Sequence, residues 1–168
     1  SFARVPQATR QRQSPRAIRR QRHGVVHPAT PVDSEYACAP RDREVHWGGK
    51  MAIIAAESFC QKGENVVRLL ADKGVDATLI NPRYLNAVDV EVLNALKDDH
   101  QLVVTLEDGC KDGGFGERIA SYYGTSQMKV LVGGIKKGLY DRYDVHELLA
   151  NNRLLDEQIV EDVLGIVD

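Results

Sequence analysis

Residues 50–81 read KMAIIAAESFCQKGENVVRLLADKGVDATLIN, and this stretch decides the fold class. Its first seven residues are almost all apolar, which is typical of a strand that is buried on both faces of a sheet. Valine and leucine then recur at helical spacing in residues 66–70, and Gly74 suits the end of that helix. A second apolar run follows at residues 75–81. The stretch therefore predicts a strand, a helix and a second strand, which is the repeating unit of a parallel sheet.

The same alternation continues to the end of the chain, with Asp89 placed to cap the next helix. Apolar periodicity predicts helices over residues 88–100, 116–124 and 154–168, and apolar runs predict strands over residues 101–107 and 127–134. Strands that alternate with helices of this length indicate a three-layer α/β/α fold around a mostly parallel sheet of about five strands. In such sheets, ligands and partners meet the loops at the carboxyl ends of the strands.

The first 49 residues differ from the rest in composition. Residues 1–23 hold seven arginines, no acidic residue and little apolar periodicity, and the prolines of residues 24–49 indicate an extended linker. We therefore predict a basic tail and linker over residues 1–49 and a folded domain over residues 50–168. Such an arm could bind nucleic acid by neutralising phosphates, although it has few aromatic residues, and we expect no nucleic-acid partner.

Several classes of protein are disfavoured by the composition. No apolar run approaches the roughly 18 residues that a membrane span needs, and the arginine-rich start lacks the apolar region of a secretory signal. The three cysteines lie far apart, and neither they nor the five histidines show metal-ligand spacing. We therefore expect a cytoplasmic protein with reduced thiols, no membrane segment and no metal site.

A glycine-rich turn follows the strand that ends at Glu107. It reads EDGCKDGGFGE over residues 107–117, and its spacing fits neither the dinucleotide pattern GxGxxG nor a phosphate loop ending in GK[ST]. Backbone N–H groups before a helix could still bind an anion, but the four carboxylates of this turn would repel one. We therefore favour a tight turn or an interface over an anion site, formed by Glu107, Asp108, Gly113, Gly114 and Gly116.

Glu107 and Asp108 end a strand, where catalytic acids also occur. Proton transfer would need a second group at a set distance from them, so we favour a helix-capping or interface role for the pair. Four cations in loops that follow strands could attract an anion, although a solvated rim is the simpler interpretation: Arg83, Lys136, Lys137 and Arg142. We predict no catalytic, cofactor-binding or metal-binding residue in this chain.

Five segments occur in the order that one known family has. They read KMAIIAAESF, GVDATLINPRYLNAVD, HQLVVTLEDGCKDGGFGERIA, MKVLVGGI and YDRYDVHELLANNRLLDEQIVEDV. This part of the chain resembles the C-terminal domain of the transketolase family of thiamine-diphosphate enzymes, and most of all the 1-deoxy-D-xylulose-5-phosphate synthases. The resemblance implies that one edge strand of the sheet runs antiparallel.

Residues 15–36, PRAIRRQRHGVVHPATPVDSEY, resemble the end of the pyrimidine-binding domain of the same family. Arg19 and Arg22 would then match two arginines of the family, and Arg22 would help to hold the sugar-phosphate substrate. Gln21 stands where the family usually has proline. By this resemblance, residues 1–49 include a remnant of the preceding domain.

The resemblance also implies an activity for a parent enzyme. That enzyme would condense pyruvate with glyceraldehyde 3-phosphate and release CO₂, in isoprenoid and thiamine biosynthesis. It would be a homodimer whose other domains bind thiamine diphosphate and Mg²⁺ through a Gly-Asp-Gly motif, which this chain lacks. We expect this chain to pack against those domains and to be inactive alone.

Two alternatives remain open. The first is the C-terminal part of a transketolase or of a 2-oxoacid dehydrogenase β-subunit, because both have similar C-terminal domains. The second is a non-enzymatic interaction module whose basic arm binds nucleic acid, with a steep dependence on salt concentration that is lost when residues 1–23 are deleted.

Overall fold

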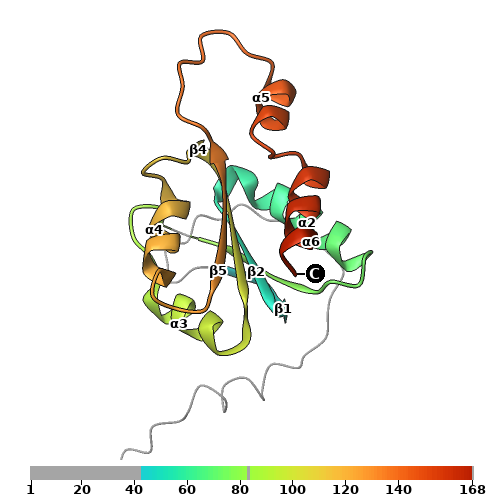
Figure 1. The fold of residues 1–168 in the computed structure, drawn as a ribbon, viewed down its shortest axis with the longest axis vertical. Coiled ribbons are helices and arrows are strands. Elements are labelled where there is room, and N and C mark those ends of the chain that lie inside the picture. The colour runs from blue at the N-terminus through green and yellow to red at the C-terminus, as the bar shows by residue number, and fades with distance from the viewer. Residues whose placement is uncertain (1–42, 83, 168) are drawn as a thin grey trace, which may run out of the picture. The chain divides into compact units, whose positions relative to one another are not determined.

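The computed structural model describes residues 43–82 and 84–167. Arg19, Arg22 and Arg83 lie outside these residues, as does most of the predicted tail. Eleven helices and strands follow one another in the described part, and strands alternate with helices from β2 to β5 as expected (Figure 1). They are β1 (Arg43–Gly49), β2 (Met51–Ala55), η1 (Glu57–Phe59), α2 (Cys60–Ala71), β3 (Ala77–Asn81), α3 (Val90–Asp99), β4 (Leu102–Cys110), α4 (Phe115–Tyr123), β5 (Lys129–Ile135), α5 (Val145–Asn151) and α6 (Asp156–Val167).

The strands form a single five-stranded sheet in the order β1-β3-β2-β4-β5. The four strands β2 to β5 pair in parallel, and β1 pairs antiparallel with β3 at one edge. The predicted fold class, a mostly parallel α/β/α sheet of five strands, is therefore confirmed. The antiparallel edge strand that the family resemblance implied is also present.

β1 lies where the sequence analysis placed a linker. The linker prediction for residues 24–49 is therefore wrong over Arg43–Gly49, and its remaining residues lie outside the described part. Gly48 fixes the strand, because its N–H donates to Thr78 Oγ1 at 2.9 Å and its carbonyl accepts from the Thr78 hydroxyl at 2.8 Å. The register shifts on both sides of His46. Such an irregular edge strand lacks the regular alternation from which strands are predicted.

In the described part, α2 and α6 cover one face of the sheet and α3 and α4 cover the other (Figure 1). One core is formed where α2 and α6 pack on β2, β3 and β4, around residues such as Ile53, Leu70 and Val163. The other is formed where α3 and α4 pack on the opposite face, around Ile54 and Ile119. Every side chain of β2 is buried, which explains why its sequence is a continuous apolar run rather than an alternating one.

Aspartate side chains cap the N-termini of two helices. Asp89 accepts hydrogen bonds from the N–H groups of Glu91 and Val92, at 3.0 and 3.1 Å, so its predicted role as the cap of α3 is confirmed. Asp144 caps α5 in the same way, through the N–H of Glu147. Within the described residues, no helix is long and apolar enough to cross a membrane.

Candidate functional site

Glu107 lies in the last part of β4, which continues to Cys110 and so ends later than the sequence analysis expected. Its side chain is buried, with 6% of the residue exposed. One carboxylate oxygen accepts a hydrogen bond from the N–H of Phe115 at 3.0 Å, and the other accepts from the N–H of Gly116 at 2.9 Å. These are the first two N–H groups of α4, which have no partner within the helix itself. Glu107 therefore caps α4 from the neighbouring strand.

The glycines let the turn close around this carboxylate. Gly113 has a φ of +75°, a left-handed conformation that glycine adopts without strain. A Cβ atom at Gly114 would lie 2.5 Å from Glu107 Oε1, and one at Gly116 would lie 2.4 Å from Thr105 Oγ1. Side chains at these two positions would therefore push α4 away from β4 and break the cap.

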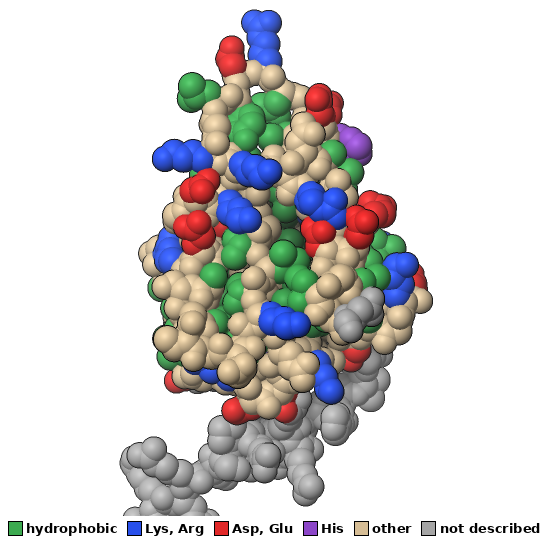
Figure 2. All heavy atoms as spheres, in the orientation of Figure 1, with side chains coloured by type: hydrophobic (Ala, Val, Ile, Leu, Met, Phe, Trp, Pro, Cys, Tyr) green, Lys and Arg blue, Asp and Glu red, His purple; other side chains and the backbone are tan. Residues whose placement is uncertain are grey.

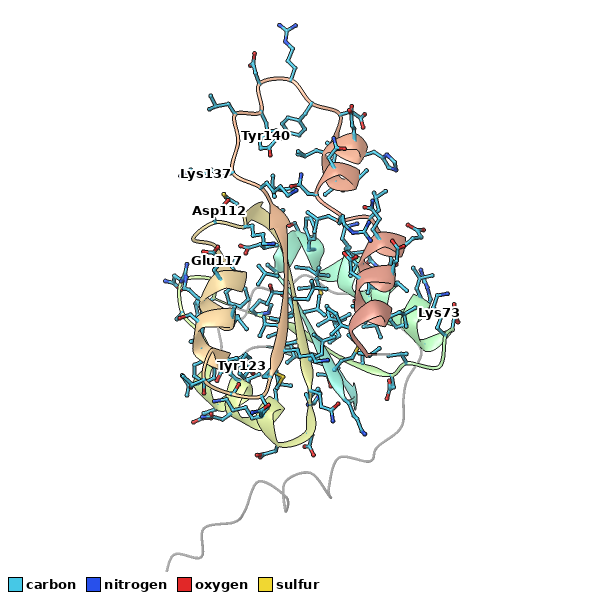
Figure 3. The ribbon with its side chains drawn as sticks, viewed as in Figure 1. Lys73, Asp112, Glu117, Tyr123, Lys137 and Tyr140 are labelled. Carbon is cyan, nitrogen blue, oxygen red and sulfur yellow. The ribbon has the colours of Figure 1, made fainter. Side chains whose placement is uncertain are left out.

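The carboxylates of the turn already occupy the amides that an anion would use. Glu107 takes the N–H groups of Phe115 and Gly116, and Glu117 accepts from the N–H of Gly113 at 2.7 Å. Asp112 accepts from the N–H of Lys137 at 3.0 Å and so joins the turn to the loop after β5. Figure 3 shows Asp112, Glu117 and Lys137 near this end of the sheet, with Tyr123 at the opposite end of α4. The geometry thus disfavours a phosphate site.

Asp108 points to a different neighbour. It accepts a hydrogen bond from the Ser58 hydroxyl at 2.7 Å, and its side chain is exposed. The structure therefore brings Glu107, Gly113, Gly114 and Gly116 together in one cap, while Asp108 faces the short helix η1. Among the described residues, no group of three or more His, Cys, Asp or Glu side chains could hold a metal ion.

A hollow of about 190 Å³ lies beside the turn, between β5 and the junction of α5 and α6. Its floor is apolar and its rim carries Lys111, Lys136, Arg153 and Asp162. The sequence analysis noted Lys136 only as a loop cation and missed the hollow. No local pattern could have shown it, because its walls come from residues far apart in the sequence.

Arg153, on that rim, is held in place by two carboxylates. Its guanidinium contacts both carboxylate oxygens of Asp162, with Nε at 2.9 Å from each, and it also contacts Glu161 at 2.6 Å. These hydrogen bonds, first to Asp162 and then to Glu161, raise the pKa of Arg153 further above its already high usual value. Its backbone has a φ of +56°, and Leu154 N–H bonds back to the Leu149 carbonyl, which ends α5 in a left-handed turn.

The loop between β5 and α5 projects beyond the sheet (Figure 1). Tyr140 donates its hydroxyl to the Lys136 carbonyl at 2.7 Å, and its ring meets that of Tyr143 edge to face. Leu139 is fully exposed, and α5 buries none of its residues. The loop therefore holds its own shape while it presents apolar side chains to its surroundings.

The family model described as "Transketolase, C-terminal domain" matches residues 42–157, more than half of the chain. This chain belongs to the transketolase C-terminal domain family. The match begins just before β1, so the family pattern includes the strand that the sequence analysis had assigned to the linker. The resemblance from which the fold was expected is therefore confirmed.

Two curated relatives of this transketolase C-terminal domain carry the same name. The chain is 31% identical over 121 residues to the 1-deoxy-D-xylulose-5-phosphate synthase of Clostridium tetani, covering 71% of the chain and 20% of that enzyme. It is 27% identical over 120 residues to the enzyme of that name from Alkaliphilus oremlandii, covering 70% of the chain and 19% of the enzyme. The chain thus spans about a fifth of the length of these relatives.

Solved structures show the same fold at lower identity. A protein described as "Split gene transketolase, inactive beta4 tetramer" superposes with a TM-score of 0.67 and 21% identity, over 74% of this chain and 41% of that one. The transketolase of Campylobacter jejuni superposes with a TM-score of 0.53 and 11% identity, over 74% of this chain and 18% of that one. At these identities the likeness concerns the fold alone.

Proposed function

We propose that this chain is the C-terminal domain of a thiamine-diphosphate-dependent 1-deoxy-D-xylulose-5-phosphate synthase, in which it acts as an interface domain. The observation that carries the proposal is its 31% identity over 121 residues to a synthase of that name. The site is consistent with this role. Glu107, the one buried carboxylate at the carboxyl ends of the parallel strands in the described part, uses both of its oxygens to cap α4.

The parent enzyme would need thiamine diphosphate and Mg²⁺. The described residues do not fit that cofactor, because the amides of the glycine-rich turn are occupied by Glu107 and Glu117. The same residues offer no cluster of metal ligands. Other domains of the parent, a homodimer by our proposal, would therefore bind the cofactor, and the present domain would close one side of their active site. We place this enzyme in the cytoplasm.

The proposal is tested with a chimera. Residues 42–168 would replace the matching C-terminal part of the Clostridium tetani synthase, and condensation of pyruvate with glyceraldehyde 3-phosphate would be measured. We expect activity from the chimera, and none from the 168-residue chain alone or from the Clostridium enzyme truncated before that part. A folded chimera without activity, or synthase activity from the chain alone, would contradict the proposal.

Arg22 and Arg19 are part of the same proposal as contacts for the sugar phosphate. In a longer chimera that carries residues 15–168, Arg22→Ala should raise the KM for glyceraldehyde 3-phosphate by about tenfold or more, since a charge-assisted hydrogen bond contributes about 1.5–3 kcal/mol. The KM for pyruvate should stay within about twofold. Arg20→Ala, which changes an arginine that matches neither of the two family arginines, serves as the control. Equal effects of the two substitutions would reject the role of Arg22.

One structural observation favours a second candidate for the parent enzyme, a transketolase. The highest TM-score reported above, 0.67, belongs to a transketolase chain described as inactive in its β4 form. If this chain were instead part of a transketolase, the chimera would fail, and a transketolase that carries residues 42–168 would transfer its two-carbon unit. A 2-oxoacid dehydrogenase β-subunit would in turn require a lipoyl acceptor. The substrates that support turnover therefore separate the three enzymes.

A further inference from the structure

β5 is an edge strand whose outer side faces no other strand of the described sheet. Lys129 donates its N–H to the carbonyl of Gln101, and the carbonyl of Ile135 accepts from Lys111, so odd-numbered residues of β5 turn their backbone groups towards β4. In a parallel pair, alternate residues turn both backbone groups the other way. The N–H and carbonyl groups of Val130, Val132 and Gly134 therefore point outward. Val130 and Val132 are half-buried and can pair with an added strand, whereas Gly134 is buried.

The hollow beside Arg153 opens next to this edge. Its apolar floor includes Leu131 and Gly133 of β5 together with Leu154 and Ile159. Figure 2 shows this face: hydrophobic side chains lie in a depression along its middle, and lysine and arginine side chains lie around them, with acidic side chains beside several of them. A hollow of about 190 Å³ is small for a drug-sized ligand, for which pockets of roughly 300–1,000 Å³ are typical. Its size suits one apolar side chain of a protein partner.

The rim of the hollow has a charge opposite to that of the domain. It carries three cations and one carboxylate, whereas residues 51–168 hold 20 acidic and 12 basic side chains. Arg153 and Asp162 pair with each other. Arg153 also pairs with Glu161, whereas Lys111 and Lys136 make no ion pair within the described residues, so the unpaired side chains of this rim are two lysines. This local excess selects a negatively charged partner.

Two other occupants are disfavoured by the same charges. The arm of this chain, residues 1–23, carries seven arginines and no acid, so the lysines would repel it. A second copy that paired edge to edge through β5 in antiparallel fashion would bring Lys129 of one copy close to Lys136 and Lys137 of the other. Like charges opposite one another destabilise such a pairing.

We propose that the β5 edge and its hollow form a docking surface for an extended, acidic segment of a partner protein. The segment adds as a strand beside β5, places one apolar side chain in the hollow, and sets acidic residues against Lys111 and Lys136. Added strands of this kind gain affinity from backbone hydrogen bonds and specificity from the side-chain pocket. The proposal concerns a surface of this domain and does not depend on which enzyme the domain belongs to.

The test uses the full 168-residue chain and a displayed library of random peptides of about ten residues, the upper length of ordinary strands. We expect the selected peptides to combine acidic residues with a central leucine, isoleucine or valine. On addition of a selected peptide, the backbone amide signals of Val130 and Val132 should shift in NMR spectra. Affinity should also fall as salt concentration rises, because exposed charges are screened.

Two variants separate the parts of the surface. Lys111→Glu combined with Lys136→Glu should weaken binding of the selected peptides by about tenfold, since each exposed ion pair contributes up to about 1 kcal/mol. Val132→Pro removes an outward N–H that the β4 pairing does not use, and it should weaken binding by about tenfold or more. The matched control is Lys73→Glu, which makes the same change of charge at an exposed lysine after α2 (Figure 3) and should leave affinity within about twofold.

Several outcomes would overturn the proposal. A library that yields no binders, or binders that are basic, would reject an acidic partner. Amide shifts outside β5, or full affinity in the folded double-lysine variant, would reject the site itself. A concentration-dependent dimer that Val132→Pro abolishes would assign the edge to a second copy. None of these results bears on the chimera, whose activity tests the enzyme identity separately.

Discussion

Glu107 is a single residue that links a strand to the helix beside it. A carboxylate at the end of a parallel strand stands where ligand-binding residues are common, yet both oxygens of Glu107 accept hydrogen bonds from the amides of α4. Its negative charge also lies at the positive end of the helix dipole. The residue thus stabilises the packing of α4 on β4. The main effect of its substitution should be a lower free energy of unfolding.

Replacement of Glu107 by alanine should lower the free energy of unfolding by about 2–4 kcal/mol, because two buried N–H groups lose a charged acceptor. Glu107→Gln keeps one acceptor oxygen and should cost about 1–2 kcal/mol. Asp108→Asn, at the exposed neighbour, should cost less than about 0.5 kcal/mol. Urea unfolding of the three variants measures the order, and an equal effect at both positions would argue against the cap.

Tyr123 is a second residue whose surroundings give a measurable prediction. It is buried and donates its hydroxyl to the Leu93 carbonyl at 2.8 Å. Burial, and then the neighbouring Tyr122, raise the pKa of Tyr123 well above its usual value. The folded state therefore holds the phenol neutral after the unfolded chain, with a tyrosine pKa of about 10, has begun to ionise. The stability that Tyr123 contributes is complete below about pH 10 and is lost as the pH rises towards the folded pKa.

The free energy of unfolding should fall by about 1 kcal/mol between about pH 10 and about pH 11 on account of Tyr123. Tyr123→Phe should remove that part of the fall, and at neutral pH it should cost about 1–2 kcal/mol through the lost hydrogen bond. Tyr122→Phe, which removes a hydroxyl bonded to the exposed Asn94 side chain, is the control and should keep the alkaline fall. Denaturant unfolding at a series of pH values measures both.

At the scale of elements, one glycine in a helix is packed tightly against the sheet, and a glycine in another helix is not. Gly116 in α4 faces Thr105 and Val132, and an added Cβ would lie 2.4 Å from Thr105 Oγ1 and 2.6 Å from Val132 Cγ1. Apart from its chain neighbours and the backbone of α6, Gly165 has no atom of the described residues within 4 Å of such a Cβ. The same substitution should therefore have opposite signs in the two helices.

Gly116→Ala should destabilise the protein by about 1–3 kcal/mol, because the extra methyl group forces α4 away from the sheet. Gly165→Ala should instead stabilise it by about 0.5–1 kcal/mol, because alanine is the better helix former and meets open space. Thermal unfolding of both variants tests the pair. Destabilisation by Gly165→Ala would show that α6 is packed on that side.

Helices and strands with a clear pattern of buried apolar residues could be predicted from the sequence. β2 and β4 follow from runs such as Met51–Ala55, and α3 follows from its spacing and from the cap at Asp89. β1 could not be predicted, because an irregular edge strand is specified by its neighbour: Gly48 is held by Thr78, 30 residues away. The cap of Glu107 was one of two roles favoured, and only three-dimensional contacts distinguish it from the other. The hollow at Arg153 could not be predicted, because the residues that line it lie far apart in the sequence.

At the scale of the whole molecule, the position of β1 predicts where the stable domain begins. We propose that a chain without residues 1–42 folds as stably as the full chain, whereas removal of residues 1–49 destabilises it by about 2 kcal/mol or more. The shorter chain lacks both hydrogen bonds between Gly48 and Thr78, each contributing about 1 kcal/mol, and exposes the edge of β3. Thermal unfolding of the two truncated chains tests this prediction. Equal melting temperatures would show that the stable domain begins at residue 50.

The place of β1 in the sheet also bears on the order of folding. β1 is the first of the five described strands to leave the ribosome, but its one partner in the described sheet is β3, and β2 and α2 are made between them. Contacts between segments distant in sequence close slowly, because the intervening chain must first be ordered. β1 must therefore wait, unpaired, until the β2-α2-β3 unit exists. During synthesis this edge is the last of that unit to close, and a chaperone that binds extended segments would find Arg43–Gly49 available for that interval.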